Sequence, residues 1–299
     1  MNLNSSINER MNQMKKILAV LLLLCLLVPA ACASEWLAEN VTEAQVGSVG
    51  GEWAVIALKR GDTPVADGFY AAYEDNVEQA LIACEGRLSP VKYTEYSRVA
   101  LALAALGENP ADFRGWNLLE PLKDLDKVKI QGNNGPIWAL IALDSNDYPG
   151  YEDARAALLD AVLSAQNEDG GYSIVTGNAS DPDMTAMAIT ALAAHRSDER
   201  AAECIRSALA CLSALEADGR LASCESCVWA MIAYASLDMR DDAARLRQFV
   251  EQYAFEGAYR HDLAEDKING MATEQAAYGI VAYQRMLDGK SRLFDMRGE

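Results

Sequence analysis

The chain has 299 residues, with 44 acidic and 26 basic side chains and a net charge of −18. Such an acidic chain is repelled by nucleic acids and by anionic membranes, so its charge argues against both as partners. The length is sufficient for one substantial domain with its own hydrophobic core.

The first residues are typical of an export signal rather than of a folded domain. Two lysines precede an apolar run over residues 17–28, and Ala31-Cys32-Ala33 supplies the small residues of a cleavage site. We therefore predict a signal peptide over residues 1–33 and a single mature domain over residues 34–299. The protein is then expected to be secreted or held at the cell surface.

Cys32 allows a second interpretation of the localisation. It lies where a lipoprotein carries its lipid, and we would expect the protein to associate with a membrane only if Cys32 is lipidated. Pro29 stands where such signals favour Leu, so free secretion is the preferred interpretation. Five of the seven cysteines follow residue 33, and an odd number in an exported chain leaves at least one unpaired.

A short glycine turn recurs along the chain at intervals of about 40 residues, which indicates a helical repeat. Its glycines are Gly47, Gly86, Gly132, Gly170, Gly219 and Gly257. Each turn is followed by an apolar run with helical periodicity, over residues 53–58, 97–106, 137–143, 184–192, 228–234 and 275–283. These runs are apolar on nearly every side, which is typical of helices buried all round.

Amphipathic segments lie between the apolar runs, as over residues 151–166, 199–215 and 241–253. Pairing each outer amphipathic helix with an inner buried one predicts an all-α protein of about twelve helices. Six inner helices that close on themselves form an α/α toroid, also described as an α6/α6 barrel. An open solenoid is the alternative, but the terminal repeats show no polar capping helix.

Two motifs resemble the superfamily of terpenoid cyclases and protein prenyltransferases. The segment QNEDGGY, residues 166–172, resembles the QW repeat of squalene–hopene cyclases, with Tyr in place of Trp. The segment DPDMTA, residues 181–186, resembles their acid motif, with Met in place of the third Asp. The resemblance implies the same six-fold toroid, a fold shared with complement thioester domains and with the helical domain of transcobalamin.

The acid motif has two interpretations. By resemblance, Asp183 would be the acid that protonates an alkene or an epoxide, although Met184 removes one of its partner carboxylates. From the residues themselves, Asp181 is expected to cap the following helix, Pro182 suits the first turn, and Asp183 lies favourably at the positive end of the helix dipole. The capping interpretation is the preferred one.

A second group resembles the zinc site of protein prenyltransferases, which combines Asp-x-Cys with a His on the next inner helix. Glu225-Ser226-Cys227 stands at the matching position, and Cys224 adds a thiol. The following run offers no His, so we expect no metal here. The two cysteines are more simply buried apolar side chains or a disulfide.

Polar and aromatic residues gather near the starts of the inner helices, which share one rim if these helices run parallel. The candidates for lining a ligand pocket are Trp53, Tyr96, Arg98, Trp138, Asp181, Asp183, Thr185, Glu225, Cys227, Trp229 and Gln275. Aromatic side chains line apolar pockets and also face cations.

These features predict an exported ligand-binding or surface-interaction protein with an apolar central pocket. The family resemblance suggests a polyprenyl lipid or a corrinoid as ligand, and a surface protein is the other expected partner. The alternative is a single-domain terpene-cyclase-like or prenyltransferase-like enzyme that uses Asp183 as its acid. The sequence identifies no cofactor.

Overall fold

A computed structural model describes residues 29–298 of the chain. Twelve α-helices and one two-stranded hairpin make up nearly all of its regular structure, so the predicted all-α class is confirmed. The predicted signal peptide lies outside the described residues, apart from residues 29–33 at the start of helix α2 (Pro29–Asn40). No helix within the described residues has the length and apolar character needed to cross a bilayer.

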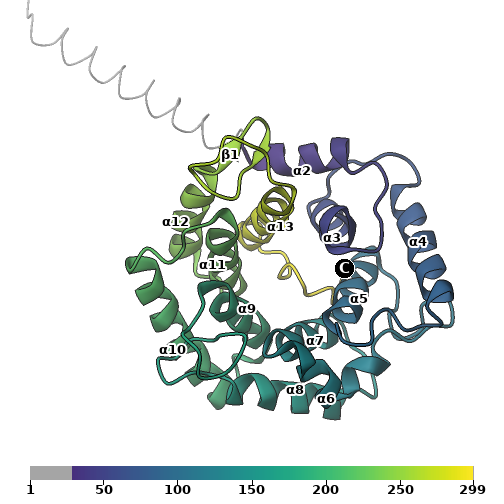
Figure 1. Cartoon of the computed structure of the whole chain (residues 1–299), viewed down its shortest axis with the longest axis horizontal. Helices are drawn as coiled ribbons and strands as arrows, with labels where there is room; N and C mark the ends of the chain where they lie inside the picture. The colour runs from purple at the N-terminus through teal and green to yellow at the C-terminus, as the bar shows by residue number, and fades with distance from the viewer. Residues whose placement is uncertain (1–28, 299) are drawn as a thin grey trace, which may run out of the picture.

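Six helices form an inner layer, and each contains one of the predicted apolar runs (Figure 1). They are α3 (Trp53–Arg60), α5 (Thr94–Leu106), α7 (Asn134–Asp144), α9 (Pro182–Leu192), α11 (Cys224–Ser236) and α13 (Gly270–Leu287). Each inner helix contacts the next, and α13 contacts α3, so the series of contacts returns to its first member. Every residue of α11 is buried, as an all-round apolar run predicts.

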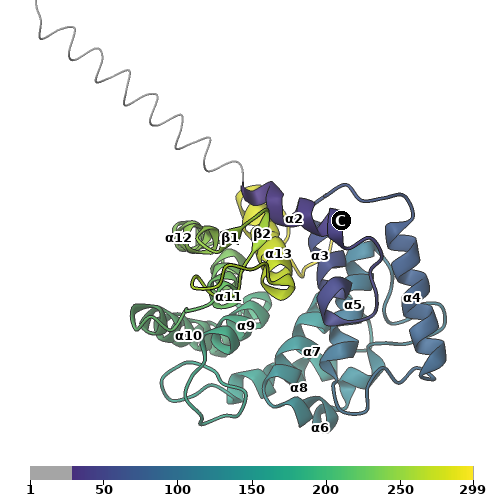
Figure 2. The ribbon, with the colours of Figure 1, turned by 45° about the horizontal axis from the view of Figure 1, so that its top comes forward.

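The outer helices cover the inner ones (Figures 1 and 2). Besides α2 they are α4 (Phe69–Ala83), the short α6 (Leu125–Val128), α8 (Glu152–Ser164), α10 (Glu199–Ala217) and α12 (Arg240–Glu251). Each outer helix buries one stripe only: α12 buries Ala243, Leu246 and Val250, at helical spacing, and leaves its charged residues outside.

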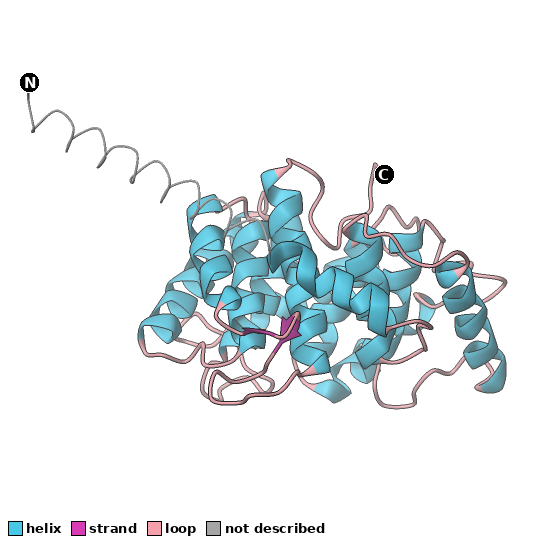
Figure 3. Ribbon diagram, turned by 90° about the horizontal axis from the view of Figure 1, so that it is seen from above, coloured by secondary structure: helices cyan, strands magenta, loops and turns pink. Residues whose placement is uncertain are grey.

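The remaining elements are short. The strands β1 (Ala254–Phe255) and β2 (Ala258–Tyr259) pair antiparallel around the turn at Gly257. Single helical turns cover Glu120–Lys123, Lys129–Gln131 and Ala193–His195, whereas Ser48–Glu52, directly before α3, has non-helical backbone angles at Val49, Gly50 and Gly51. Figure 3 shows the hairpin on one side of the helical layer and the C-terminus on the other.

The start of α9 shows the role of Asp181, the first acidic residue of the DPDMTA motif. Asp181 Oδ1 accepts a hydrogen bond from Met184 N at 2.9 Å, so the predicted helix cap is confirmed. Thr185 is fully buried, and its hydroxyl accepts from Tyr172 N at 3.0 Å and donates to Asp181 O at 2.7 Å. The motif therefore fastens the preceding loop to the first turn of the helix.

The start of α13 repeats this arrangement with different residues. Asn269 caps the helix through Ala272 N at 3.0 Å, and Thr273 accepts from Tyr259 N at 3.0 Å. The repeat that the glycine turns indicate thus extends to the hydrogen bonds that begin the inner helices.

Hydrogen bonds and ion pairs also link the starts of the inner helices to one another. They join Arg98 Nε to Glu52 Oε2 at 2.6 Å, Thr94 N to Gln131 Oε1 at 3.0 Å, Asn133 N to Ile174 O at 2.9 Å, His261 Nδ1 to Glu225 Oε2 at 2.8 Å, and Gly50 N to Glu274 Oε1 at 2.6 Å. All six inner helices therefore begin on one side of the molecule, which we call the N-terminal face.

The C-terminal tail, residues 289–298, leaves α13 and runs into the space between the inner helices (Figure 1). Leu293, Phe294 and Met296 are buried there. Arg60 donates to the carbonyl of Leu293 at 3.0 Å, and Met296 N donates to Ser145 O at 2.7 Å. The tail thus places Phe294 in the interior, where the sequence predicts an apolar pocket.

Candidate functional site

An aromatic cluster occupies the interior between the inner helices. The ring centroids of Trp53 and Trp138 lie 4.9 Å apart, and those of Trp138 and Trp229 lie 5.5 Å apart. Tyr278 lies 5.9 Å from Trp229, and Phe294 lies 5.7 Å from Trp138. The structure therefore brings together three of the predicted candidates and adds two residues from the last helix and the tail.

Four carboxyl groups stand at the N-terminal face beside this cluster, on Glu52, Asp183, Glu225 and Glu274. Three of them have close partners, since Glu52 pairs with Arg98, Glu225 with His261, and Glu274 accepts from Gly50 N. Asp183 differs, because its Oδ1 is buried and has no hydrogen-bond donor within the described residues.

Burial sets the chemistry of Asp183. The pKa of its carboxyl group is raised to about 6, and desolvation by burial is the largest cause. The charges of Asp181 and Glu225 also raise this pKa, while the Ser226 hydroxyl and His261 act to lower it. A rise of this size corresponds to about 3 kcal/mol, whereas a helix dipole stabilises a carboxylate by about 0.3–1 kcal/mol. The helix dipole that the sequence leads us to expect therefore stabilises the Asp183 carboxylate by less than desolvation destabilises it.

Helix α13 contributes three polar side chains to the N-terminal face, those of Glu274, Gln275 and Tyr278. Burial raises the pKa of Glu274 to about 7, against the lowering effect of the Gly50 N–H. Within the described residues Oε1 of Gln275 is buried without a hydrogen-bond donor, like Oδ1 of Asp183. Burial raises the pKa of Tyr278, and the charges of Glu274 and Asp183 raise it further.

The other predicted candidates serve different contacts. Tyr96 packs against Tyr93 in a tilted arrangement, with ring centroids 5.5 Å apart, and within the described residues it makes no ring contact with the tryptophans. Cys227 lines a separate cavity with Tyr253, between α10, α11 and α12. Arg98 neutralises Glu52, while Asp181 and Thr185 hold the start of α9 in the way described above.

The cysteines are all free within the described residues, including Cys224 and Cys227. Burial raises the pKa of Cys227 to about 12 and raises that of Cys224 as well, which disfavours the thiolate that a metal requires. Across residues 29–298, no three or more His, Cys, Asp or Glu side chains are grouped to hold a metal ion.

Several residues of the site were not among the sequence candidates. Glu274 and Tyr278 lie about one helical turn apart on α13, so a helical projection that started one residue before the predicted run of residues 275–283 would have found them. Glu52 directly precedes Trp53. Phe294 follows the last repeat and has no periodic signal.

The arrangement combines acceptor oxygens without donors, aromatic faces and an acid that changes charge near neutral pH. Ionised Asp183 accepts hydrogen bonds, and neutral Asp183 is able to give a proton. Comparison of the chain with protein-family models, with curated proteins and with solved structures finds no match.

Proposed function

We propose that the chain is an exported α/α toroid that binds a small molecule at its N-terminal face. Asp183 is the observation that carries this proposal, since it is a buried carboxyl group whose Oδ1 has no donor within the described residues. A buried acceptor without a donor costs free energy, and a ligand that supplies the donor relieves that cost. The six inner helices and the contact between α3 and α13 support the toroid.

The ligand's chemistry follows from the groups around Asp183. Within the described residues Gln275 offers a second acceptor without a donor, and Tyr278 offers an aromatic face whose centroid lies 5.7 Å from that of Trp53. This set favours a molecule with an apolar body and a hydroxyl or ammonium head. A polyprenyl alcohol fits this description, and the family resemblance also leads to polyprenyl lipids.

The loops of the N-terminal face give a further reason to place the ligand there. Most of the large apolar side chains that are exposed in the described part of the chain lie on these loops or at the first turns of the inner helices. They are Val49, Val91, Ile130, Ile174, Val175, Leu263, Ile268 and Met271. An apolar body, or the surface of a partner protein, would cover side chains that water otherwise meets.

Tryptophan fluorescence tests the proposal, because Trp53, Trp138 and Trp229 all belong to the aromatic cluster. Farnesol, a prenyl chain that ends in a hydroxyl, is expected to change the emission saturably, and Asp183→Asn is expected to weaken its binding. Asp153→Asn, on the exposed face of α8, is the matched control. An unchanged emission, together with no lipid detected by mass spectrometry of the purified protein, would count against binding.

The second candidate function is acid catalysis, and the raised pKa of Asp183 is the observation that favours it. A neutral Asp183 would donate its proton to an alkene carbon, and the tryptophan faces would stabilise the resulting cation. The test is incubation with squalene and shorter polyprenyl substrates. Cyclised product from the parent and none from Asp183→Asn would establish the enzyme, since the amide has no acidic proton to give.

A further inference from the structure

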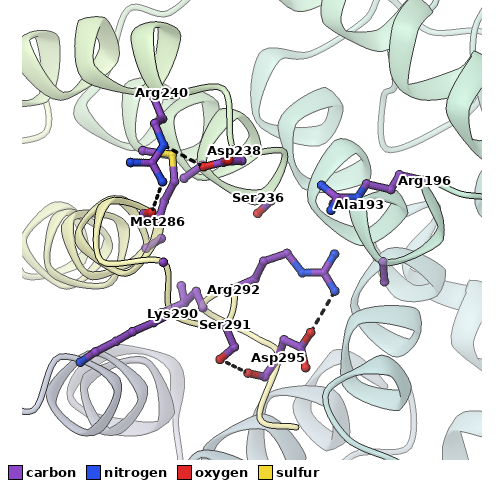
Figure 4. Close-up of a pocket in the computed structure, with 15 residues that line it drawn as sticks. Ala193, Arg196, Ser236, Asp238, Arg240, Met286, Lys290, Ser291, Arg292 and Asp295 are labelled. Carbon is purple, nitrogen blue, oxygen red and sulfur yellow. Dashed lines mark hydrogen bonds and ion pairs between the residues drawn. The ribbon is translucent and has the colours of Figure 1, made fainter. Parts of the chain in front are cut away.

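A cavity of about 460 Å³ lies at the opposite end of the inner helices, where α9, α11 and α13 finish and the tail begins (Figure 4). Its lining comes from the ends of these three helices, from the turns that follow α9 and α11, from the start of α12 and from residues of the tail. The volume is within the range of small-molecule sites. We call it the C-terminal cavity.

Two arginines of this cavity have donors to spare. No hydrogen bond or ion pair joins Arg196 to any residue in the described part of the chain, and its side chain is exposed. Arg292 gives one N–H to Asp295 at 3.1 Å and keeps its other guanidinium donors. Figure 4 shows both side chains ending beside the same open space, while Lys290 is turned away and pairs with Asp62.

The acids of the cavity are already engaged. Asp238 accepts from Arg240 at 3.1 Å, and Asp295 accepts from both Arg292 and Arg297. The charge that remains beside the open space is therefore positive, although the whole chain carries −18. Two guanidinium groups beside one space repel each other unless an anion comes between them.

Part of the cavity lining is apolar, with small or flexible side chains. These residues are Ala193, Ala194, Ala235, Ala282 and Met286. Alanine methyl groups and a flexible Met side chain suit a short hydrocarbon better than a highly polar molecule. The lining thus combines charged and apolar groups.

We infer that the C-terminal cavity binds a small organic anion, a carboxylate on a short apolar body. The carboxylate lies between Arg196 and Arg292, which present the planar forks that pair with it, and the body contacts the apolar side chains of the lining. The ends of α9, α11 and α13 act against an anion with about half a negative charge each. Arg196, Arg292 and Arg297 together with Asp295 carry a net charge of +2, which outweighs these helix ends. This site is independent of the N-terminal face.

Methyl NMR of the full chain with labelled methionines locates such a ligand, because Met286 lines the cavity and Met271 lies on the N-terminal face. The probe is hexanoate at low salt, with hexylammonium as the control of opposite charge. We expect hexanoate to shift Met286 saturably and to leave Met271 in place. Arg196→Gln is expected to weaken the affinity at least tenfold without lowering the melting temperature, because this side chain has no partner to lose.

Arg206→Gln, on the exposed side of α10, is the matched arginine control and is expected to bind hexanoate like the parent. The inference is overturned if hexanoate leaves Met286 unshifted, or if Arg196→Gln and Arg206→Gln bind it equally. If inorganic phosphate binds as tightly as hexanoate and with the same dependence on Arg196, the claim that the ligand carries an apolar body is overturned.

Discussion

The two ends of the inner helices differ in the charge of the side chains that gather there. The N-terminal face gathers the carboxyl groups of Glu52, Asp183, Glu225 and Glu274, whereas the C-terminal cavity gathers arginines. Each sign complements the helix dipoles at its own end. The difference teaches that a charge that complements the helix dipole does not by itself identify a ligand-binding residue. Burial and existing ion pairs or hydrogen bonds decide which charged side chain remains available to a ligand.

Removal of the Phe294 ring is expected to have the largest effect, because the C-terminal tail fills the interior with that side chain. Phe294→Ala should lower the free energy of unfolding by about 3–5 kcal/mol, through lost burial and the cavity left among the tryptophans. Denaturant unfolding measures it. Phe249→Ala, at an exposed position on α12, is the control and should change stability by less than about 1 kcal/mol. Equal losses in both variants would show that the tail does not complete the core.

The N-terminal face gives a prediction that depends on pH. The pKa of Asp183 is raised to about 6 in the folded chain, so between about pH 4 and 6 the native state binds more protons than the unfolded state. The contribution of Asp183 to stability therefore falls as pH rises through that window. Asp183→Asn should stabilise the protein by about 1–3 kcal/mol at pH 8 and have little effect at pH 4.

Unfolding curves at pH 4, 6 and 8 check this prediction, with Asp153→Asn on α8 as the exposed control. A difference between parent and Asp183→Asn that stays constant across the three pH values would contradict a desolvated acid. It would leave Asp183 as an ordinary member of the first helical turn.

The smallest expected change in stability concerns Asp181, which caps α9, in contrast to the buried Asp183. Asp181→Ala removes the hydrogen bond to Met184 N and should cost about 1 kcal/mol. Asp181→Asn should leave stability nearly unchanged, because Asn caps a helix as well as Asp does. Thermal unfolding of the two variants is sufficient, and a loss with Asn as large as that with Ala would show that the charge, rather than the cap, is required.

The helices of the inner layer could be predicted because their pattern is local. Runs apolar on every side require burial on every side, and the cap at Asp181 follows from side-chain chemistry within one turn. The assignment of the ring as a family toroid remains a proposal, as does the family resemblance itself. Export also remains a proposal, because the predicted signal lies almost wholly outside the described residues.

The candidate site could be predicted only in part, because its groups meet through contacts distant in sequence. The three tryptophans lie on predicted inner runs and do meet. The burial of Asp183 depends on α11, and the position of Phe294 depends on Arg60, which is far away in the chain. Neither dependence leaves a periodic pattern, so the sequence alone favours the cap and overlooks the tail.

A carbon NMR titration of the side-chain carboxyl groups tests the central claim most directly, with Asp183→Asn used to assign the signal. The central claim is that Asp183 is a desolvated acid at the end of the molecule that takes the ligand. It predicts a midpoint near pH 6 that moves when farnesol is added. A midpoint near the ordinary value of about 4, unmoved by farnesol, would contradict it.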